Sequence, residues 1–187
     1  MNTAHAEICG SAEWAEHLTT ESMPPTLAGV DLGDDLLEVG PGYGAATLFL
    51  APTVRALTAV EIDPELGLRL RGLVPDNVEV LIEDASAMSL PDNRFSAAVC
   101  FTMLHHVPTP ALQDAIFADV HRVLAPGAWY LGSDSTDTPE WRDLHIDDIC
   151  VPVDPAGLPD RLAAAGFVDV TVSSRPAEPL RFRGRKP

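Results

Sequence analysis

A glycine-rich bend that follows an acidic residue is the part of this sequence best suited to bind a ligand. The segment LLEVGPGYGAAT places Glu38 two residues before Gly40, and further glycines follow at Gly42 and Gly44. Glycine lets the backbone approach a ligand at positions where a Cβ atom would collide with it. A helix that starts after the bend presents unpaired N–H groups and a partial positive charge. The segment therefore predicts a ligand-binding turn between a strand and a helix.

The carboxylates near the bend indicate which ligand it binds. Gly40, Gly42 and Ala45 fit the dinucleotide pattern G-x-G-x-x-G/A, which is typical of diphosphate binding. Glu38 would oppose a diphosphate, whereas it suits an ammonium or sulfonium group. Glu61 ends the next apolar run, where an acid can accept hydrogen bonds from both ribose hydroxyls. We therefore expect an adenosine that carries a positively charged, phosphate-free tail.

Short apolar runs that alternate with amphipathic stretches predict the elements that position this bend. Helices are expected after Asp63-Pro64 and Thr109-Pro110, where a capping residue precedes proline at the first helical position. Such alternation predicts an α/β fold with a doubly wound, mostly parallel sheet and helices on both faces. The predicted strands are 36–39, 56–62, 78–82, 97–104, 128–132 and 168–172.

Two helices allow more detailed predictions. In the stretch 109–124, Leu112, Ile116, Val120 and Val123 share one stripe, and Pro126-Gly127 ends the helix. Near the N-terminus, Ser11 can cap a helix that runs to about residue 20, before MPPTL restarts the chain after a break. Trp14 and His17 of that helix could cover the ligand pocket, but packing onto the sheet is the favoured interpretation for Trp14.

Two histidines follow the fourth predicted strand, at the sheet edge where a substrate would meet the ligand. His105 or His106 could accept a proton near neutral pH, although either could equally be a packed structural residue. His145 and Asp148 could contribute to a substrate pocket, but a plain loop is the favoured interpretation. The histidines without metal-ligand spacing are His5, His17, His121 and His145. We therefore expect no metal site.

The composition limits the classes of partner. The chain has 187 residues, as expected of a single domain, and its 28 Asp and Glu outnumber 12 Lys and Arg, for a net charge of −16. Such a surface repels phosphate backbones and anionic lipids, so we expect neither nucleic acid nor a membrane as partner. Cys9, Cys100 and Cys150 are sparse and unpaired in pattern, which favours free thiols. With no visible signal peptide or membrane span, we expect a cytoplasmic protein.

A series of motifs in order resembles a known family. LLEVGPGYG, AVEIDPEL, LIEDASAMSLPDNRF, FTMLHHV and DVHRVLAPGAWYLGSD are similar to the motifs of class I S-adenosylmethionine-dependent methyltransferases of the small-molecule type, over about residues 33 to 187. The resemblance implies a Rossmann-like, seven-stranded sheet whose last strand, LRFRGRK, is antiparallel and inserted. It also implies one domain, with a helical segment at 1–32, a cofactor-binding half at 33–135 and a C-terminal half at 136–187.

The resemblance further implies roles for individual residues toward S-adenosylmethionine. Glu38 and the turn at Gly40, Pro41, Gly42 and Gly44 would cradle the methionine part. Glu61 would hold the ribose, since Asp63 is occupied as a helix cap, and Ile62 would stack beside the adenine. Asp84 and the Ala85 backbone would face the adenine amino group, and Phe101 would lie near the methyl-bearing sulfur.

The implied reaction moves a methyl group to an unidentified acceptor, which we expect to be a small molecule. Methyl transfer requires mainly positioning and desolvation, and His105 or His106 could act as a base if the acceptor is a phenol or hydroxyl. An NAD(P)-dependent oxidoreductase is an alternative, although the chain lacks its Tyr-Lys or His-Asp arrangement. A non-catalytic S-adenosylmethionine-binding module is another. The oligomeric state is left open.

Overall fold

The strands of the computed structural model, which describes residues 1–175 and 178–187, form one sheet of seven strands in the order β3-β2-β1-β4-β5-β7-β6. Strands β1 to β5 pair in parallel, and β7 runs antiparallel between β5 and β6. This confirms the predicted sheet, including its inserted last strand. The strands are β1 Asp35–Val39, β2 Ala56–Glu61, β3 Val78–Ile82, β4 Phe95–Phe101, β5 Leu124–Asp134, β6 Val168–Ser173 and β7 Leu180–Arg185.

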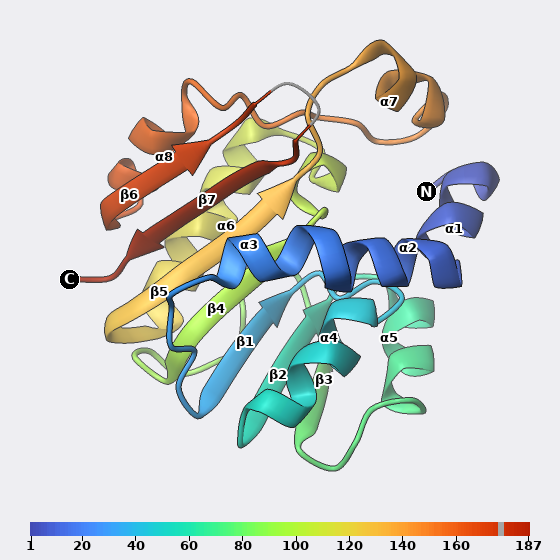
Figure 1. Cartoon of the computed structure of the whole chain (residues 1–187). Coiled ribbons are helices and arrows are strands. Elements are labelled where there is room, and N and C mark those ends of the chain that lie inside the picture. The colour runs from blue at the N-terminus through green and yellow to red at the C-terminus, as the bar shows by residue number, and fades with distance from the viewer. Residues whose placement is uncertain (176–177) are drawn as a thin grey trace.

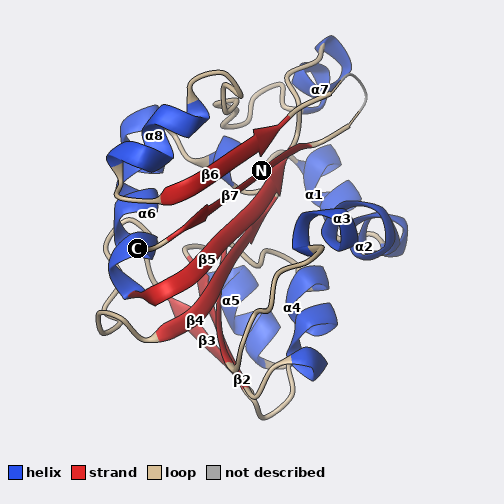
Figure 2. Cartoon of the chain, turned by 60° about the vertical axis from the view of Figure 1, so that its left-hand side comes forward, coloured by secondary structure: helices blue, strands red, loops and turns tan. Residues whose placement is uncertain are grey.

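Helices cover both faces of this sheet (Figures 1 and 2). Helices α6 and α8 lie against one face, and α3, α4 and α5 lie against the other, while α1 and α7 lie beyond one end of the strands. The helices are α1 Thr3–Cys9, α2 Ala12–His17, α3 Met23–Leu27, α4 Ala45–Leu50, α5 Pro64–Arg71, α6 Pro110–Val123, α7 Pro139–Leu144 and α8 Leu158–Ala164, with short π- or 3-10 segments at Leu18–Ser22, Ala51–Thr53 and Leu104–His106. Among the described residues, no helix is both long enough and apolar enough to cross a membrane.

The core has two halves, one on each face of the sheet. Alternation along β1 places Leu36 in the half that contains Leu50 of α4, and Leu37 in the half that contains Phe117 of α6. All four side chains are at most 1% exposed, and full burial of each is worth about 1.5–3 kcal/mol. The strands are therefore held rigidly from both faces, which fixes the positions of the loops at their carboxyl ends.

Local capping signals predict the helix starts correctly. The Asp63 carboxylate accepts hydrogen bonds from the N–H groups of Glu65 and Leu66, and the Thr109 hydroxyl accepts one from Leu112. Three details differ from expectation. The side chain of Leu112 is 39% exposed, so the buried stripe of α6 starts at Ile116. The chain remains helical through Leu18–Ser22, so no break precedes MPPTL.

The third difference concerns the end of α6. This helix stops at Val123 and β5 begins at Leu124, so Pro126-Gly127 lies inside the strand rather than ending the helix. The pairing of β4 with β5 shifts register between Phe95 and Ala97, which accommodates this irregular start of β5.

The close approach of α4 to α5 leads to a testable prediction about Gly44. This residue has φ +88°, and an added Cβ would lie 2.3 Å from Cδ1 of Leu70, whose side chain is 1% exposed. Gly29 has φ +76° with no atom within 4 Å of an added Cβ, so it is a matched control for backbone strain alone. Since overpacking costs about 1–3 kcal/mol, we expect Gly44→Ala to lower the free energy of unfolding by at least about 1 kcal/mol more than Gly29→Ala. Urea unfolding measures both, and equal losses would contradict the packing role of Gly44.

Candidate functional site

The candidate site lies where the order of strands reverses. Strands β1 and β4 are parallel neighbours, with Val39 opposite Cys100, but their connections lead to β2 and β5 on opposite sides. In open α/β sheets, such a reversal leaves a crevice beyond the carboxyl ends of the two strands, where ligands bind. The bend that starts at Gly40 lies at this crevice, as the sequence pattern predicts.

Two cavities occupy the crevice and together contact nearly all the predicted cofactor residues. The first has a volume of about 120 Å³, and the second, closer to β3, about 340 Å³. Both are lined by Gly40, Met103 and His106, so they meet at these residues. Of the predicted residues, the first cavity is lined by Glu38, Gly40, Pro41, Gly42, Glu61 and Phe101, and the second by Gly40, Ile62, Asp84 and Ala85.

The bend depends on three glycines in the left-handed region, with φ values of +69°, +54° and +88° at Gly40, Gly42 and Gly44. The Gly40 N–H donates to the Val60 carbonyl at 2.9 Å, and an added Cβ there would lie 2.2 Å from Cγ of Met103. At Gly42, an added Cβ would meet no atom within 4 Å, although this residue lines the first cavity. Gly42 thus leaves room for a ligand. Gly44 lines neither cavity and instead allows α4 to pack against α5.

Glu61 connects the end of β2 to the bend. Its Oε2 accepts a hydrogen bond from the Gly42 N–H at 2.9 Å, and its Oε1 accepts one from the Asp63 N–H at 3.0 Å. The residue is 6% exposed and lines the first cavity. Because a carboxylate oxygen can accept more than one hydrogen bond, Glu61 keeps lone pairs for ligand hydroxyls.

The Glu38 carboxylate is buried, and few interactions compensate for its loss of contact with water. The residue is 2% exposed, and its Oε2 has no hydrogen-bond partner in the described part of the chain. Burial raises the pKa of Glu38 to about 7; the nearby Thr47 hydroxyl opposes this rise, and the charge of Glu61 adds to it. A cationic ligand group in the first cavity would stabilise the ionised form of Glu38.

The second cavity has apolar walls and a polar loop at its rim. Ile62 is 66% exposed beside it, while the Ala85 side chain is buried. The Asp84 carboxylate accepts the Ser86 N–H at 2.8 Å, which fixes the turn that presents the Ala85 backbone. This loop is anchored to α6, because Arg122 donates to the carbonyls of Met88 and Leu90. A flat apolar ring with polar edges suits such a cavity.

Several lining residues were not predicted from the sequence. Thr102 directly follows β4 with φ +49°, a strained value for a β-branched residue, and its N–H donates to the Ser133 carbonyl at 2.7 Å. Together with Met103 and Tyr43, it lines the first cavity. Trp14 also lines this cavity, which agrees with the alternative that it covers the pocket. Tyr43, Thr102 and Met103 lie within the motifs LLEVGPGYG and FTMLHHV, but the sequence assigns no role to these individual residues.

The structure places His105 and His106 in different environments. His105 is 2% exposed, and its Nδ1 lies 2.5 Å from Oδ1 of Asp134. His106 lines both cavities, and burial together with its neighbours His105 and His5 lowers its pKa to about 3. Such a pKa makes His106 a weak base at neutral pH. His145 and Asp148 also lie close to this pair, through His5, which contacts both.

Comparisons with known proteins extend these observations. The sequence model of the family described as "Methyltransferase domain" matches residues 37–132. A ribosomal RNA small subunit methyltransferase A of Corynebacterium diphtheriae is 32% identical over 114 residues, which cover 56% of this chain and 39% of that protein. The chain spans only 35% to 39% of the length of the first curated relatives it matches.

Solved structures share the fold. The PH0226 protein of Pyrococcus horikoshii superposes with a TM-score of 0.79 at 16% identity, covering 96% of this chain and 94% of that chain. A Haemonchus contortus phosphoethanolamine N-methyltransferase 2, solved with S-adenosylhomocysteine, gives a TM-score of 0.70 at 13% identity, covering 98% of this chain and 60% of that one.

The raised pKa of Glu38 predicts a pH-dependent effect on stability. A carboxyl whose pKa rises on folding, here from 4.5 to about 7, costs stability once the pH exceeds 4.5, and the full cost is reached above pH 7. Glu38→Gln removes this cost. We therefore expect the difference in free energy of unfolding between this variant and the wild type to be more favourable to the variant at pH 8 than at pH 4.5, by on the order of 3 kcal/mol. Denaturant titrations at both pH values measure the difference. Glu79→Gln on the exposed side of β3 is the baseline, and an equal response of the two variants would exclude the buried charge as the cause.

Proposed function

The chain belongs to the class I S-adenosylmethionine-dependent methyltransferases, and we propose that its methyl acceptor is a small molecule. The main support for this site is the environment of Glu38. One oxygen of this buried carboxylate has no hydrogen-bond partner among the described residues, and the backbone at Gly42, which lines the same cavity, leaves space for a ligand. Its neighbour Glu61 keeps free lone pairs toward the same cavity. A cation and a pair of hydroxyls on one ligand satisfy these groups together.

The chemistry of the site residues fits S-adenosylmethionine along its whole length. Glu38 suits the positively charged methionine part, and the space beside Gly42 admits it without a collision. Glu61 is positioned for the ribose hydroxyls, and the second cavity at Ile62 and Ala85 suits the adenine. When bound, the cofactor supplies a methyl group activated by a sulfonium centre. The unbranched Met103 side chain, which borders both cavities, can adjust its rotamers to the ligand that passes it.

The contribution of this chain to the reaction is mainly to position and desolvate the reactants. Alignment of two reactants can supply about 7–11 kcal/mol of the barrier without any acid or base. Phe101 and Thr102 end β4 at the wall of the first cavity, and the rigid sheet holds them there. A catalytic role for His105 or His106 stays a prediction, and the low pKa of His106 weakens it for that residue.

The charges around the first cavity favour a neutral or cationic acceptor. Helices α1 and α2, whose Cys9 and Trp14 line this cavity, carry Glu7, Glu13 and Glu16, and residues 1–54 contain neither Lys nor Arg. Among the described residues that line this cavity are Glu38 and Glu61 but no Lys or Arg. We call this opening of the first cavity the acidic mouth. A polyanion would meet repulsion here, whereas RNA binding requires several cationic contacts to phosphates.

Ribosomal RNA is the competing acceptor, because the curated relatives are named as methyltransferases of ribosomal RNA. That likeness covers 41% to 56% of this chain and 35% to 39% of the relatives. A shared fold does not determine the substrate, so the acceptor has to be argued from the site. The charge of the acidic mouth is therefore a stronger argument about the acceptor than the names of relatives that match only part of the chain.

Loss of the Glu61 carboxylate should weaken cofactor binding without unfolding the chain. Because charge-assisted hydrogen bonds contribute about 1.5–3 kcal/mol, we expect Glu61→Gln to raise the Kd for S-adenosylhomocysteine at least tenfold, as measured by calorimetry. Glu79→Gln retains the same change of charge outside the site and should bind as the wild type does. An unchanged affinity in Glu61→Gln would remove Glu61 from the cofactor site.

The acceptor class can be tested by following release of S-adenosylhomocysteine. We expect turnover with a neutral or cationic member of a panel of small amines, phenols and thiols, and none with a small-subunit ribosomal RNA fragment. The acidic mouth predicts this order because phosphates are repelled there. Methylation of the RNA fragment at low salt, with no small acceptor active, would contradict the proposed acceptor class.

A further inference from the structure

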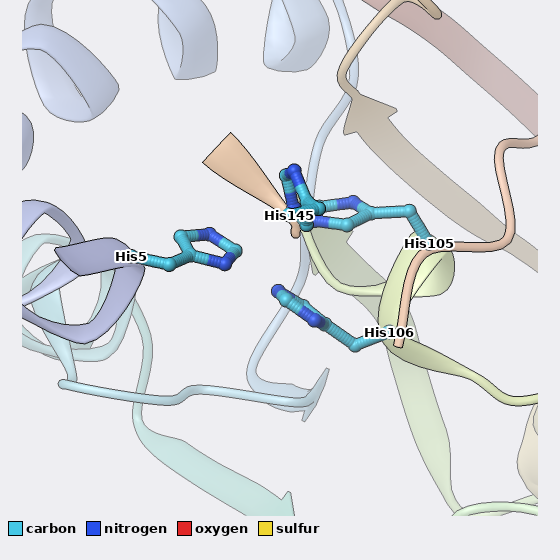
Figure 3. Close-up of side chains that lie close together, drawn as sticks. All are labelled: His5, His105, His106 and His145. Carbon is cyan, nitrogen blue, oxygen red and sulfur yellow. The ribbon is translucent and has the colours of Figure 1, made fainter. Parts of the chain in front are cut away.

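Four histidines from three distant parts of the chain meet beside the cofactor site. His5 belongs to α1, His105 and His106 form the short helix after β4, and His145 directly follows α7. When one ring nitrogen is taken from each histidine, these four nitrogens all lie within 4.8 Å of one another. Figure 3 shows the four rings directed toward a common centre from opposite sides.

Hydrogen bonds on the outer side of the cluster fix three of the rings. Nδ1 of His105 lies 2.5 Å from the Asp134 carboxylate, and Nδ1 of His5 lies 3.0 Å from the Asp148 carboxylate. Nδ1 of His145 lies 2.6 Å from the carbonyl of Trp141, which can only accept, so this nitrogen carries the proton. When Nδ1 donates outward, the Nε2 lone pair faces the centre of the cluster, and this is the arrangement typical of histidines that ligate metals.

The inner nitrogens lack partners. Nε2 of His105 and Nε2 of His145 are both buried without a hydrogen-bond partner among the described residues, and these residues are 2% and 4% exposed. Each unsatisfied buried nitrogen destabilises the fold, because water can no longer bond to it. Two such nitrogens within one cluster are available to bind a ligand at its centre.

We propose that His5, His105, His106 and His145 bind one divalent transition metal ion of the Zn²⁺ type. Neutral imidazoles suit such borderline metals, and four nitrogen ligands suit the tetrahedral geometry of Zn²⁺. The ideal separation between ligand nitrogens in a tetrahedral site is about 3.4 Å, so small side-chain rotations are enough to close the cluster around an ion. The carboxylates of Asp134 and Asp148 balance the two positive charges of the metal.

The bound metal joins elements that are otherwise held by few contacts. Asn2 already connects the start of α1 to the end of α7, since its side-chain amide donates to the carbonyls of Leu144 and Ile146. The metal adds a link from both helices to the carboxyl end of β4. It therefore holds α1, whose Cys9 lines the first cavity, against α7 and the end of β4. The geometry of the four histidines supports this site whichever acceptor the chain uses.

The test uses the full chain, stripped with a chelator, and titrated with Zn²⁺ in calorimetry and with Co²⁺ as a spectroscopic probe. We expect one ion per chain, a rise in Tm on binding, and the visible absorption typical of tetrahedral Co²⁺. His5→Ala and His145→Ala should each raise the Kd at least 100-fold, and Asp148→Asn should raise it 10–100-fold. His17→Ala, which removes an exposed histidine of α2, should bind as the wild type does.

The alternative outcomes are distinct. Binding that is equally tight in His5→Ala, His145→Ala and the wild type, or a Co²⁺ spectrum typical of octahedral oxygen ligands, would overturn the proposal. So would the absence of stoichiometric binding to the stripped wild type. Circular dichroism identifies any alanine variant that fails to fold, and Asp148→Asn, which keeps all four ligands, then decides the outcome. Calorimetry with S-adenosylhomocysteine on the same stripped protein reports separately on the cofactor site.

Discussion

The site depends on two buried carboxylates, Glu38 and Glu61, at the carboxyl ends of adjacent strands. Burial and the nearby charge of Glu61 raise the pKa of Glu38, and the two carboxylates differ in the hydrogen bonds they accept. Glu61 accepts hydrogen bonds from two backbone N–H groups, those of Gly42 and Asp63, whereas one oxygen of Glu38 has no partner in the part of the chain that the structure describes. The charge of ionised Glu38 is therefore the one with fewer hydrogen bonds to stabilise it, and a cationic ligand in the first cavity would supply this stabilisation.

The same constraint explains the local geometry around the carboxylates. The Gly42 N–H can reach Glu61 only because the bend turns through left-handed residues, which glycine adopts without strain. Asp63 donates its N–H to Glu61, and its side chain caps α5. Since Glu61 also accepts a hydrogen bond from Gly42, the start of α5 is held in a fixed position relative to the bend. Gly44 in turn allows α4 to lie close to α5. A change at any of these residues thus alters the shape of the first cavity.

The sequence predicts the parts of this arrangement that depend on local chemistry. Strand runs buried on both faces, the caps Asp63 and Thr109 and the glycine bend each depend on neighbouring residues, and the structure confirms them. Features that depend on tertiary contacts were missed. Leu112 has the helical spacing of a core residue, but it lies at the rim of the second cavity, where no element covers it. For Trp14 the sequence leaves two alternatives open, because the surroundings of this residue in the first cavity come from distant segments.

The histidine cluster shows this limit most clearly, and it also connects the two sites. Its members are separated by up to 140 positions, so no spacing rule for metal ligands could group them. His106 belongs to the cluster and also lines both cavities of the cofactor site. A ligand that orders His106 from one side changes the free energy of binding on the other side, and such coupling is reciprocal. With a metal bound, the part of the cavity walls formed by His106 would be preorganised, so less ordering would accompany cofactor binding and the affinity for the cofactor would rise accordingly.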